Sequence, residues 1–203
     1  MRRIGGIRLC GRLRAIVDLK PYLGQSESQP RPTPGVVGPE DIPMRLVVIA
    51  VGRLKQGPER ELAERYRERF DDIGRKLGFR GLEIQEIPES RARDGQRRIA
   101  EEATAISAAI PPKSVIIALD ERGDSIDSQG FARHLARWRD DQVANTIFII
   151  GGADGLSPEL RRMAGLRMAF GSATWPHQMA RVMLLEQVYR AATILAGHPY
   201  HRA

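Results

Sequence analysis

Cysteine is almost absent from this sequence of 203 residues, in which Cys10 is the single example. One thiol cannot form an intramolecular disulfide or a zinc site built from several cysteines. This scarcity is typical of proteins in the reducing cytoplasm, which is the localisation we expect. The sequence also lacks an uninterrupted apolar run approaching the roughly 20 residues of a membrane-spanning helix, so we expect no membrane partner.

Several common catalytic patterns are missing as well. Of the four histidines only His198 and His201 are close in sequence, and no acidic residue lies between them, so we expect no metal site. The chain has neither a serine nucleophile elbow nor a cysteine nucleophile. Its glycine cluster after residue 150 matches neither the dinucleotide-binding fingerprint nor a P-loop, which disfavours a nicotinamide-dependent dehydrogenase.

Basic residues exceed acidic ones by 32 to 25, which gives a formal net charge of +7 and an isoelectric point of about 10.1. An excess of this size suits a polyanionic partner, but it is equally compatible with a soluble basic enzyme. The hydrophobic fraction of 42% is sufficient for a sizeable core in one domain.

The composition changes near residue 44. Residues 1–43 contain six of the thirteen prolines, and Ser26–Pro34 is typical of a disordered linker. The stretch Arg2–Arg14 carries five arginines and no acid, as transit peptides or basic arms do. We favour a simpler interpretation, in which residues 1–43 are a disordered extension from an upstream start and residues 44–203 form the functional domain.

From residue 44 onward, apolar strands alternate with amphipathic helices. Two strands are apolar at nearly every position, which indicates a sheet covered on both faces and an α/β fold with a largely parallel sheet flanked by helices. The predicted strands are 45–51, 82–87, 115–119, 146–150 and a short one near 168–170. The predicted helices begin at Pro58, near Ile99, before Phe131 and at Pro158, and a long one covers about 178–196.

Ligands of parallel α/β proteins bind beyond the carboxyl ends of the strands. Three loops follow predicted strands here: Asp120–Gly123, Gly151–Leu156 and Phe170–His177. Glycines in the second loop allow a ligand to approach the backbone closely. Each loop alone is a weak signal, because a glycine cluster is often only a turn, and Trp175 and His177 are also compatible with a core residue and a helix start.

Two further features have competing interpretations. The C-terminal segment Gly197–Ala203 contains two histidines, a tyrosine and an arginine, and is either a frayed tail or a cluster that stacks on a base and exchanges a proton with it. Arg181, near the start of the last helix, is either an RNA or cofactor contact or part of a solvated helix face, and we favour the solvated face.

Four sequence blocks in order strongly resemble the ribosomal RNA large subunit methyltransferase H family. They are Ile149–Leu156, Thr174–Arg181, Glu186–Ala191 and His198–Arg202. The resemblance extends over essentially all of 44–203 and includes the opening strand. It implies an S-adenosylmethionine-dependent RNA methyltransferase of the SPOUT class, with a C-terminal trefoil knot, acting as a homodimer. The substrate it implies is the pseudouridine at position 1915 of 23S ribosomal RNA, methylated on N3 in the assembled ribosome.

The resemblance also assigns site residues. It places the cofactor contacts at Leu119, Gly151, Phe170, Gly171, Ser172, Ala173, Thr174 and Trp175, within the three loops selected above. Trp175 stands where the family more often has leucine or phenylalanine, so the pocket wall is apolar but larger.

Our catalytic hypothesis places the C-terminal tail of one subunit in the other subunit's cofactor pocket. There His201 or Tyr200 removes the N3 proton and Arg202 stabilises the anion or a phosphate. From residue 44 onward the net charge is only +4, which favours recognition of a folded ribosomal surface over naked RNA. The alternatives are a SPOUT enzyme acting on transfer RNA and a non-catalytic RNA-binding factor.

Overall fold

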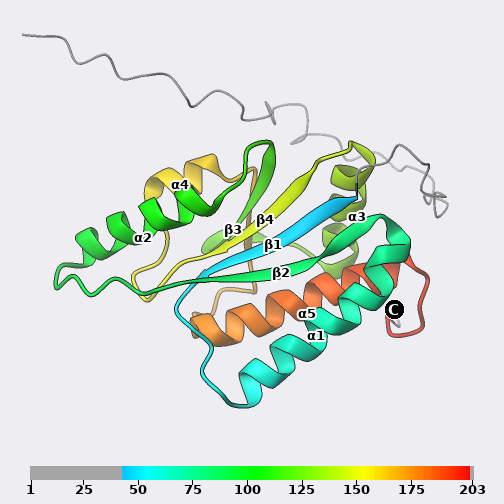
Figure 1. Ribbon diagram of the computed structural model, residues 1–203, viewed down its shortest axis with the longest axis horizontal. Helices are drawn as coiled ribbons and strands as arrows, with labels where there is room; N and C mark the ends of the chain where they lie inside the picture. The colour runs from blue at the N-terminus through cyan, green and yellow to red at the C-terminus, as the bar shows by residue number, and fades with distance from the viewer. Residues whose placement is uncertain (1–42, 202–203) are drawn as a thin grey trace, which may run out of the picture.

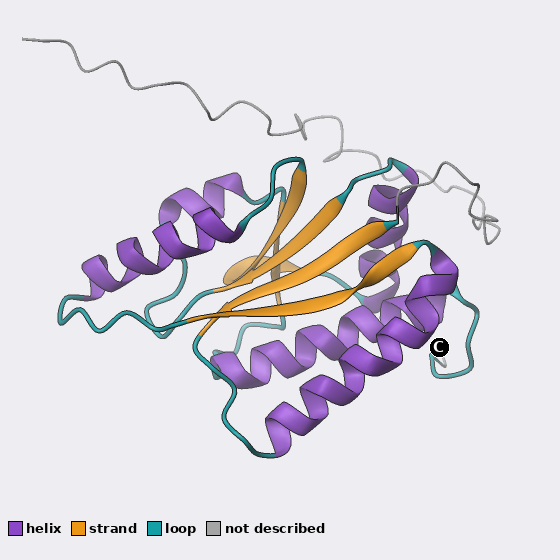
Figure 2. Ribbon diagram, in the orientation of Figure 1, coloured by secondary structure: helices purple, strands orange, loops and turns teal. Residues whose placement is uncertain are grey.

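The computed structural model describes residues 43–201, which form a five-stranded sheet with helices on both faces (Figures 1 and 2). The strands are β1 (Met44–Val51), β2 (Phe79–Ile87), β3 (Ser114–Ser125), β4 (Asn145–Ile150) and β5 (Leu166–Ala169). Their order is β2-β1-β4-β3-β5 and every pairing is parallel. The predicted parallel α/β sheet is therefore confirmed, whereas the predicted extension over 1–43 lies, except for Pro43, outside the described residues.

Helices cover the sheet in two unequal groups. They are α1 (Pro58–Gly74), the short 3₁₀ helix η2 (Arg75–Leu77), α2 (Gly95–Ala109), α3 (Ser128–Asp140), α4 (Pro158–Met163) and α5 (His177–Leu195). α1, α3 and α5 pack on one face, and α2 and α4 on the other (Figure 1). In the described part of the chain no helix is long and apolar enough to cross a membrane.

Side chains of the central strands alternate between two separate cores, as the period of a strand requires. In β1, Val48 belongs to the core under α1, α3 and α5, whereas Val47 and Ile49 belong to the core under α2 and α4. Phe148 and Ile149 of β4 divide in the same way. Because both faces are buried, the central strands β1 and β4 are apolar at nearly every position, which is the pattern that the sequence predicted.

The strand boundary that differs most from the prediction is the end of β3, while β2 begins three residues earlier than predicted, at Phe79. β3 does not end at Asp120 but continues to Ser125, so the stretch expected to be a loop is largely extended. A register shift after Leu119 lets Asp124 and Ser125 pair with β5. This pairing satisfies backbone groups of a polar stretch whose composition alone suggested a loop.

α5 connects the two ends of the sheet. It begins at His177, near the carboxyl ends of the central strands, and its other end leads to the C-terminal segment (Figure 1). At 1.5 Å per residue, a helix of 19 residues is about 28 Å long. The chain therefore enters its C-terminal segment far from the carboxyl edge of the sheet.

Candidate functional site

A cavity of about 610 Å³ opens at the carboxyl ends of β4 and β5 and beside Leu119–Glu121, in the middle of β3. Its volume lies within the range of small-molecule sites, roughly 300–1,000 Å³. Most of its walls come from the segments after β4 and β5. Of the eight residues predicted to bind the cofactor, seven line this cavity: Leu119, Gly151, Phe170, Gly171, Ala173, Thr174 and Trp175. Ser172, the eighth, is exposed and does not line it.

The loop after β4 approaches its own backbone closely at Gly151. A Cβ at this position would lie 2.7 Å from the carbonyl carbon of Gly155, so no side chain fits there without moving the loop. Gly152 and Gly155 are joined by an isolated bridge, in which the Gly155 N–H donates to the Gly152 carbonyl at 3.0 Å. The loop is thus a compact turn that presents backbone rather than side chains to the cavity.

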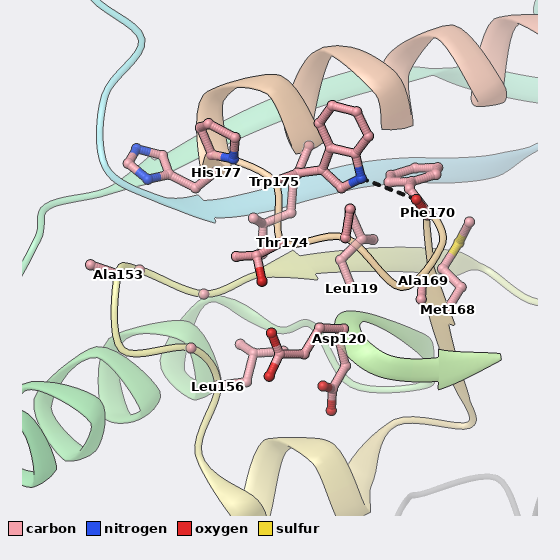
Figure 3. A pocket seen from close by; sticks show the side chains of 18 of the residues that line it. Leu119, Asp120, Ala153, Leu156, Met168, Ala169, Phe170, Thr174, Trp175 and His177 are labelled. Atoms are coloured by element: carbon pink, nitrogen blue, oxygen red, sulfur yellow. Dashed lines mark hydrogen bonds between the residues drawn. The ribbon is translucent and has the colours of Figure 1, made fainter. Parts of the chain in front are cut away.

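The segment after β5 forms the opposite wall. Gly171 has φ +89°, a left-handed conformation that favours glycine, and it allows the chain to turn over the cavity. The Trp175 indole Nε1 donates a hydrogen bond of 3.0 Å to the Phe170 carbonyl and closes this turn (Figure 3). Trp175 is 45% exposed, so it is a wall of the cavity and not a core residue.

Acidic groups face the cavity from the other side (Figure 3). Asp120 is buried, and its Oδ2 lies 3.0 Å from Arg161 Nε of α4 in an ion pair whose angle is not that of a hydrogen bond. Asp120 Oδ1 accepts a hydrogen bond from the Arg122 N–H at 3.1 Å. Asp120 therefore lies in the pocket wall with its carboxylate held beside Arg161, which also lines the cavity, although β3 continues beyond Asp120.

An ion pair that the sequence did not predict fixes the glycine loop to α2. Arg98 Nε and Nη2 donate to the two carboxylate oxygens of Asp154 at 2.6 and 2.9 Å. The Arg98 guanidinium holds the pKa of Asp154 below its usual range. The sequence could not predict this pair, because the two residues are 56 positions apart and belong to different segments of the fold. The four arginines of Arg91–Arg98 were the only available signal.

Glu102 of α2 is a second buried group beside this loop. Its Oε1 accepts a hydrogen bond from the Ser90 N–H at 3.1 Å, while Oε2 has no hydrogen-bond partner within residues 43–201. A Cβ on Gly152 would lie 2.8 Å from this free oxygen. Glu102 therefore packs directly against the backbone of the pocket loop.

Arg181 is fully buried, so the predicted solvated helix face is wrong. Its Nη1 donates to Glu86 Oε1 at 2.6 Å, and its Nη2 donates to the Gly52 carbonyl at 2.8 Å. Burial lowers the pKa of Arg181, while the Glu86 carboxylate raises it. The side chain does not line the pocket; it ties the first turns of α5 to the ends of β1 and β2.

The C-terminal segment folds back against the second half of α5. The Tyr200 hydroxyl is 3.2 Å from Glu186 Oε1, its ring contacts Tyr189 at 4.8 Å between centroids, and Arg190 lies over the ring at 5.1 Å. Burial and the Glu186 carboxylate raise the pKa of Tyr200 to about 12. Both ring nitrogens of His201 are shielded from solvent and have no hydrogen-bond partner among the described residues. Arg202 lies outside the described residues.

The tail and the cavity are therefore not together in one chain. The structure brings seven of the eight predicted cofactor residues together, but Tyr200 packs against Glu186 and Tyr189 of α5, and neither Tyr200 nor His201 lines the cavity. His177, which begins α5 as predicted, lines the cavity instead. Within the described range, no group of three or more His, Cys, Asp or Glu side chains is placed to hold a metal ion.

Comparison with known proteins agrees with this arrangement. A family model described as "Predicted SPOUT methyltransferase" matches residues 44–201. The ribosomal RNA large subunit methyltransferase H of Rhodopseudomonas palustris (strain BisB18) is 77% identical over 160 residues, which are 79% of this chain and 100% of that protein. The protein of the same name from Bradyrhizobium sp. (strain ORS 278) is 76% identical over 160 residues, 79% of this chain and 99% of its own length.

The chain belongs to the ribosomal RNA large subunit methyltransferase H family. The resemblance seen in the four sequence blocks is thus confirmed, and the chain is a SPOUT-class methyltransferase by family. Among solved structures, the SpoU methyltransferase AviRb from Streptomyces viridochromogenes, crystallised with the cofactor AdoMet, has a TM-score of 0.34 and 16% identity. That match covers 78% of this chain and 62% of the other.

Proposed function

We propose that the protein transfers a methyl group from S-adenosylmethionine to N3 of the pseudouridine at position 1915 of 23S ribosomal RNA in the assembled ribosome. The observation that carries this proposal is the cavity at the carboxyl edge of the sheet, lined by seven residues that the family resemblance independently assigns to the cofactor. We place the reaction in the cytoplasm, where assembled ribosomes are found.

The cavity suits the chemistry of this cofactor. Leu119, Met168 and Phe170 offer apolar surface to an adenine ring, and the glycine loop offers backbone groups for its polar edges. The carboxylates of Asp120 and Glu121 line the cavity and would suit a cationic sulfonium. When bound, S-adenosylmethionine supplies an activated methyl group, and the protein contributes binding, orientation and removal of a proton.

Proton removal falls to the C-terminal tail in this proposal. N3 of pseudouridine carries a hydrogen, and it becomes a strong nucleophile once that proton has left. His201 has two ring nitrogens without partners in the described chain, which suits a base that meets its substrate only in the complex. Tyr200 is a weaker candidate, because its raised pKa keeps the phenol protonated near neutral pH. We assign Arg202 to the developing anion or a phosphate.

A homodimer reconciles the tail with the cavity. Within one chain Tyr200 packs against Glu186, nine residues and so about 14 Å along α5 from His177 of the cavity wall. A tail that enters the pocket of a second subunit removes this separation without unfolding α5. We therefore propose a homodimer in which each cofactor pocket is completed by the tail of the partner subunit.

We also propose the C-terminal trefoil knot of the SPOUT class. Its support is the close packing of the segments around the cavity, where β3 runs alongside β5 and the glycine loop after β4 faces the turn after β5. An experimental structure tests this directly, because the path of 151–176 either passes through a loop of the chain or runs around it.

Methyl transfer from radiolabelled S-adenosylmethionine tests the function. The substrates are ribosomes that lack the modification, protein-free 23S ribosomal RNA and bulk transfer RNA, each assayed with wild-type protein and with His201→Ala. We expect label on ribosomes alone and a loss of at least about 100-fold in His201→Ala, the range of general-base contributions. Label on transfer RNA would support the alternative SPOUT substrate. Cofactor binding without label on any RNA would support a non-catalytic binding factor.

A further inference from the structure

Two arginines beside the cavity have no counterion among residues 43–201. Arg91 and Arg93 lie in the segment between β2 and α2, and both side chains are exposed. Neither makes an ion pair or a side-chain hydrogen bond with any described residue. An arginine that folding leaves unpaired keeps its charge and all its donors available for a partner.

The backbone of this segment is nevertheless fixed. Arg98 Nη1 donates to the carbonyls of Ala92 and Arg93, each at 3.0 Å. The same guanidinium binds Asp154 of the glycine loop. Arg98 therefore joins the backbone of Ala92 and Arg93 to the glycine loop of the pocket wall. This contact holds the segment that carries Arg91 and Arg93 beside the cavity.

A second pair of exposed cations extends this surface. Arg53 and Lys55 follow β1, and they too make no ion pair or side-chain hydrogen bond with the described residues. A Cβ on Gly52 would lie 2.7 Å from Glu89 Oε1 and 3.1 Å from His177 Nε2. The segments after β1 and β2 therefore meet next to His177, a residue of the cavity wall.

Nearby carboxylates do not cancel this charge. Asp94 accepts the Arg97 N–H at 2.8 Å and caps α2, and Glu101 is bound by Arg97 Nε at 2.9 Å. Glu89 lies 4.0 Å from the imidazole of His177. The two segments therefore carry four exposed cations, Arg53, Lys55, Arg91 and Arg93, against two exposed carboxylates, Glu89 and Asp94.

We propose that Arg53, Lys55, Arg91 and Arg93 form a basic strip that binds phosphates of the RNA backbone next to the target nucleotide. The inference deepens the proposed function, on which it rests for the identity of the RNA. It offers a way for a domain with a net charge of only +4 to hold a polyanion: four cations without a partner among the described residues lie in two segments next to the pocket. Phosphate contacts of this kind set register and orientation and do not read sequence.

The test compares two double variants. Arg91→Gln with Arg93→Gln removes two charges from the strip. The matched control, Arg75→Gln with Lys76→Gln, removes two exposed charges just before β2, at the end of that strand opposite to Arg91 and Arg93. For each protein we would measure KM and kcat with ribosomes, the affinity for S-adenosylmethionine, and ribosome cosedimentation as a function of salt.

We expect the strip variant to raise KM for ribosomes about tenfold or more, with kcat and cofactor affinity unchanged. Each lost phosphate contact lowers the slope of log affinity against log salt by roughly 0.7–0.9, so cosedimentation should lose about 1.5 of slope. The control should match the wild type in every measurement. A strip variant that binds ribosomes with wild-type affinity and salt slope would overturn the inference. Cosedimentation does not require turnover, so this outcome is distinct from a failure of the proposed methyl transfer.

Discussion

Arg181 Nη1 and Glu86 Oε1 lie 2.6 Å apart and join the first turns of α5 to the end of β2. The arginine is fully buried, and the carboxylate also accepts the Leu54 N–H at 2.8 Å. The pair therefore gathers three segments that converge at one edge of the cavity. The pair supports the pocket from outside, because neither Arg181 nor Glu86 lines the cavity.

Breaking this pair should destabilise the fold strongly. Arg181→Met fills much of the volume but leaves Glu86 without its counterion, so the free energy of unfolding should fall by about 3–5 kcal/mol. Chemical denaturation measures this change. The control is Arg97→Met, which removes an exposed ion pair with Glu101 and should cost no more than about 1 kcal/mol. A loss below about 1 kcal/mol in Arg181→Met would contradict the role given to the pair.

A methyl group on Gly151 should damage cofactor binding. The added Cβ would lie 2.7 Å from the carbonyl carbon of Gly155, so the loop must open. We expect Gly151→Ala to weaken S-adenosylmethionine binding at least about tenfold by calorimetry, which is about 1.4 kcal/mol. Ser172→Ala is the control, because Ser172 does not line the cavity. Equal affinities for the two variants would show that the glycine loop does not hold the cofactor.

Trp175 should report cofactor binding by its fluorescence. The chain has two tryptophans, of which Trp138 is 4% exposed in the core and Trp175 is 45% exposed on the cavity wall. Titration with S-adenosylmethionine should therefore change the emission of Trp175 alone. In Trp175→Phe the change should vanish while the Trp138 signal stays. A binding-dependent change that persists in Trp175→Phe would place the cofactor elsewhere.

Tyr200 should make stability sensitive to alkaline pH. Its pKa is raised to about 12 in the folded protein from an ordinary value of 10.0, mainly by burial. The folded state thus keeps a proton that the unfolded state loses, so this contribution is complete below about pH 10 and is lost as pH rises toward 12. Denaturation from pH 9 to 11.5 should show a smaller decline for Tyr200→Phe than for the wild type. Parallel declines would mean that the phenol is not shielded as described.

The sheet could be predicted because short, local sequence patterns identify its strands and the helices between them. Apolar runs such as 146–150 identify buried strands by composition, and Pro58 and Pro158 mark helix starts by the one position where proline fits well. The strand-end rule likewise located the cavity, since it depends only on where strands stop.

What the sequence left undetermined depends on contacts between distant positions. Arg181 looked solvated because its partner Glu86 is 95 residues away. β3 looked shorter than it is because pairing with β5, and not apolar composition, extends it to Ser125. The position of His201 relative to the cavity depends on the direction of α5 in space, which no periodicity reveals.

The most direct test of the whole account is to locate the methyl group. Ribosomes that lack the modification would be incubated with the protein and S-adenosylmethionine, and reverse transcription across the region of position 1915 would be combined with mass spectrometry of the digested RNA. A methyl on N3 blocks the base-pairing edge, so we predict a strong stop next to this nucleotide, together with one added methyl on pseudouridine. Methylated RNA that carries the group on another nucleotide, with no stop at this position, would contradict the central claim.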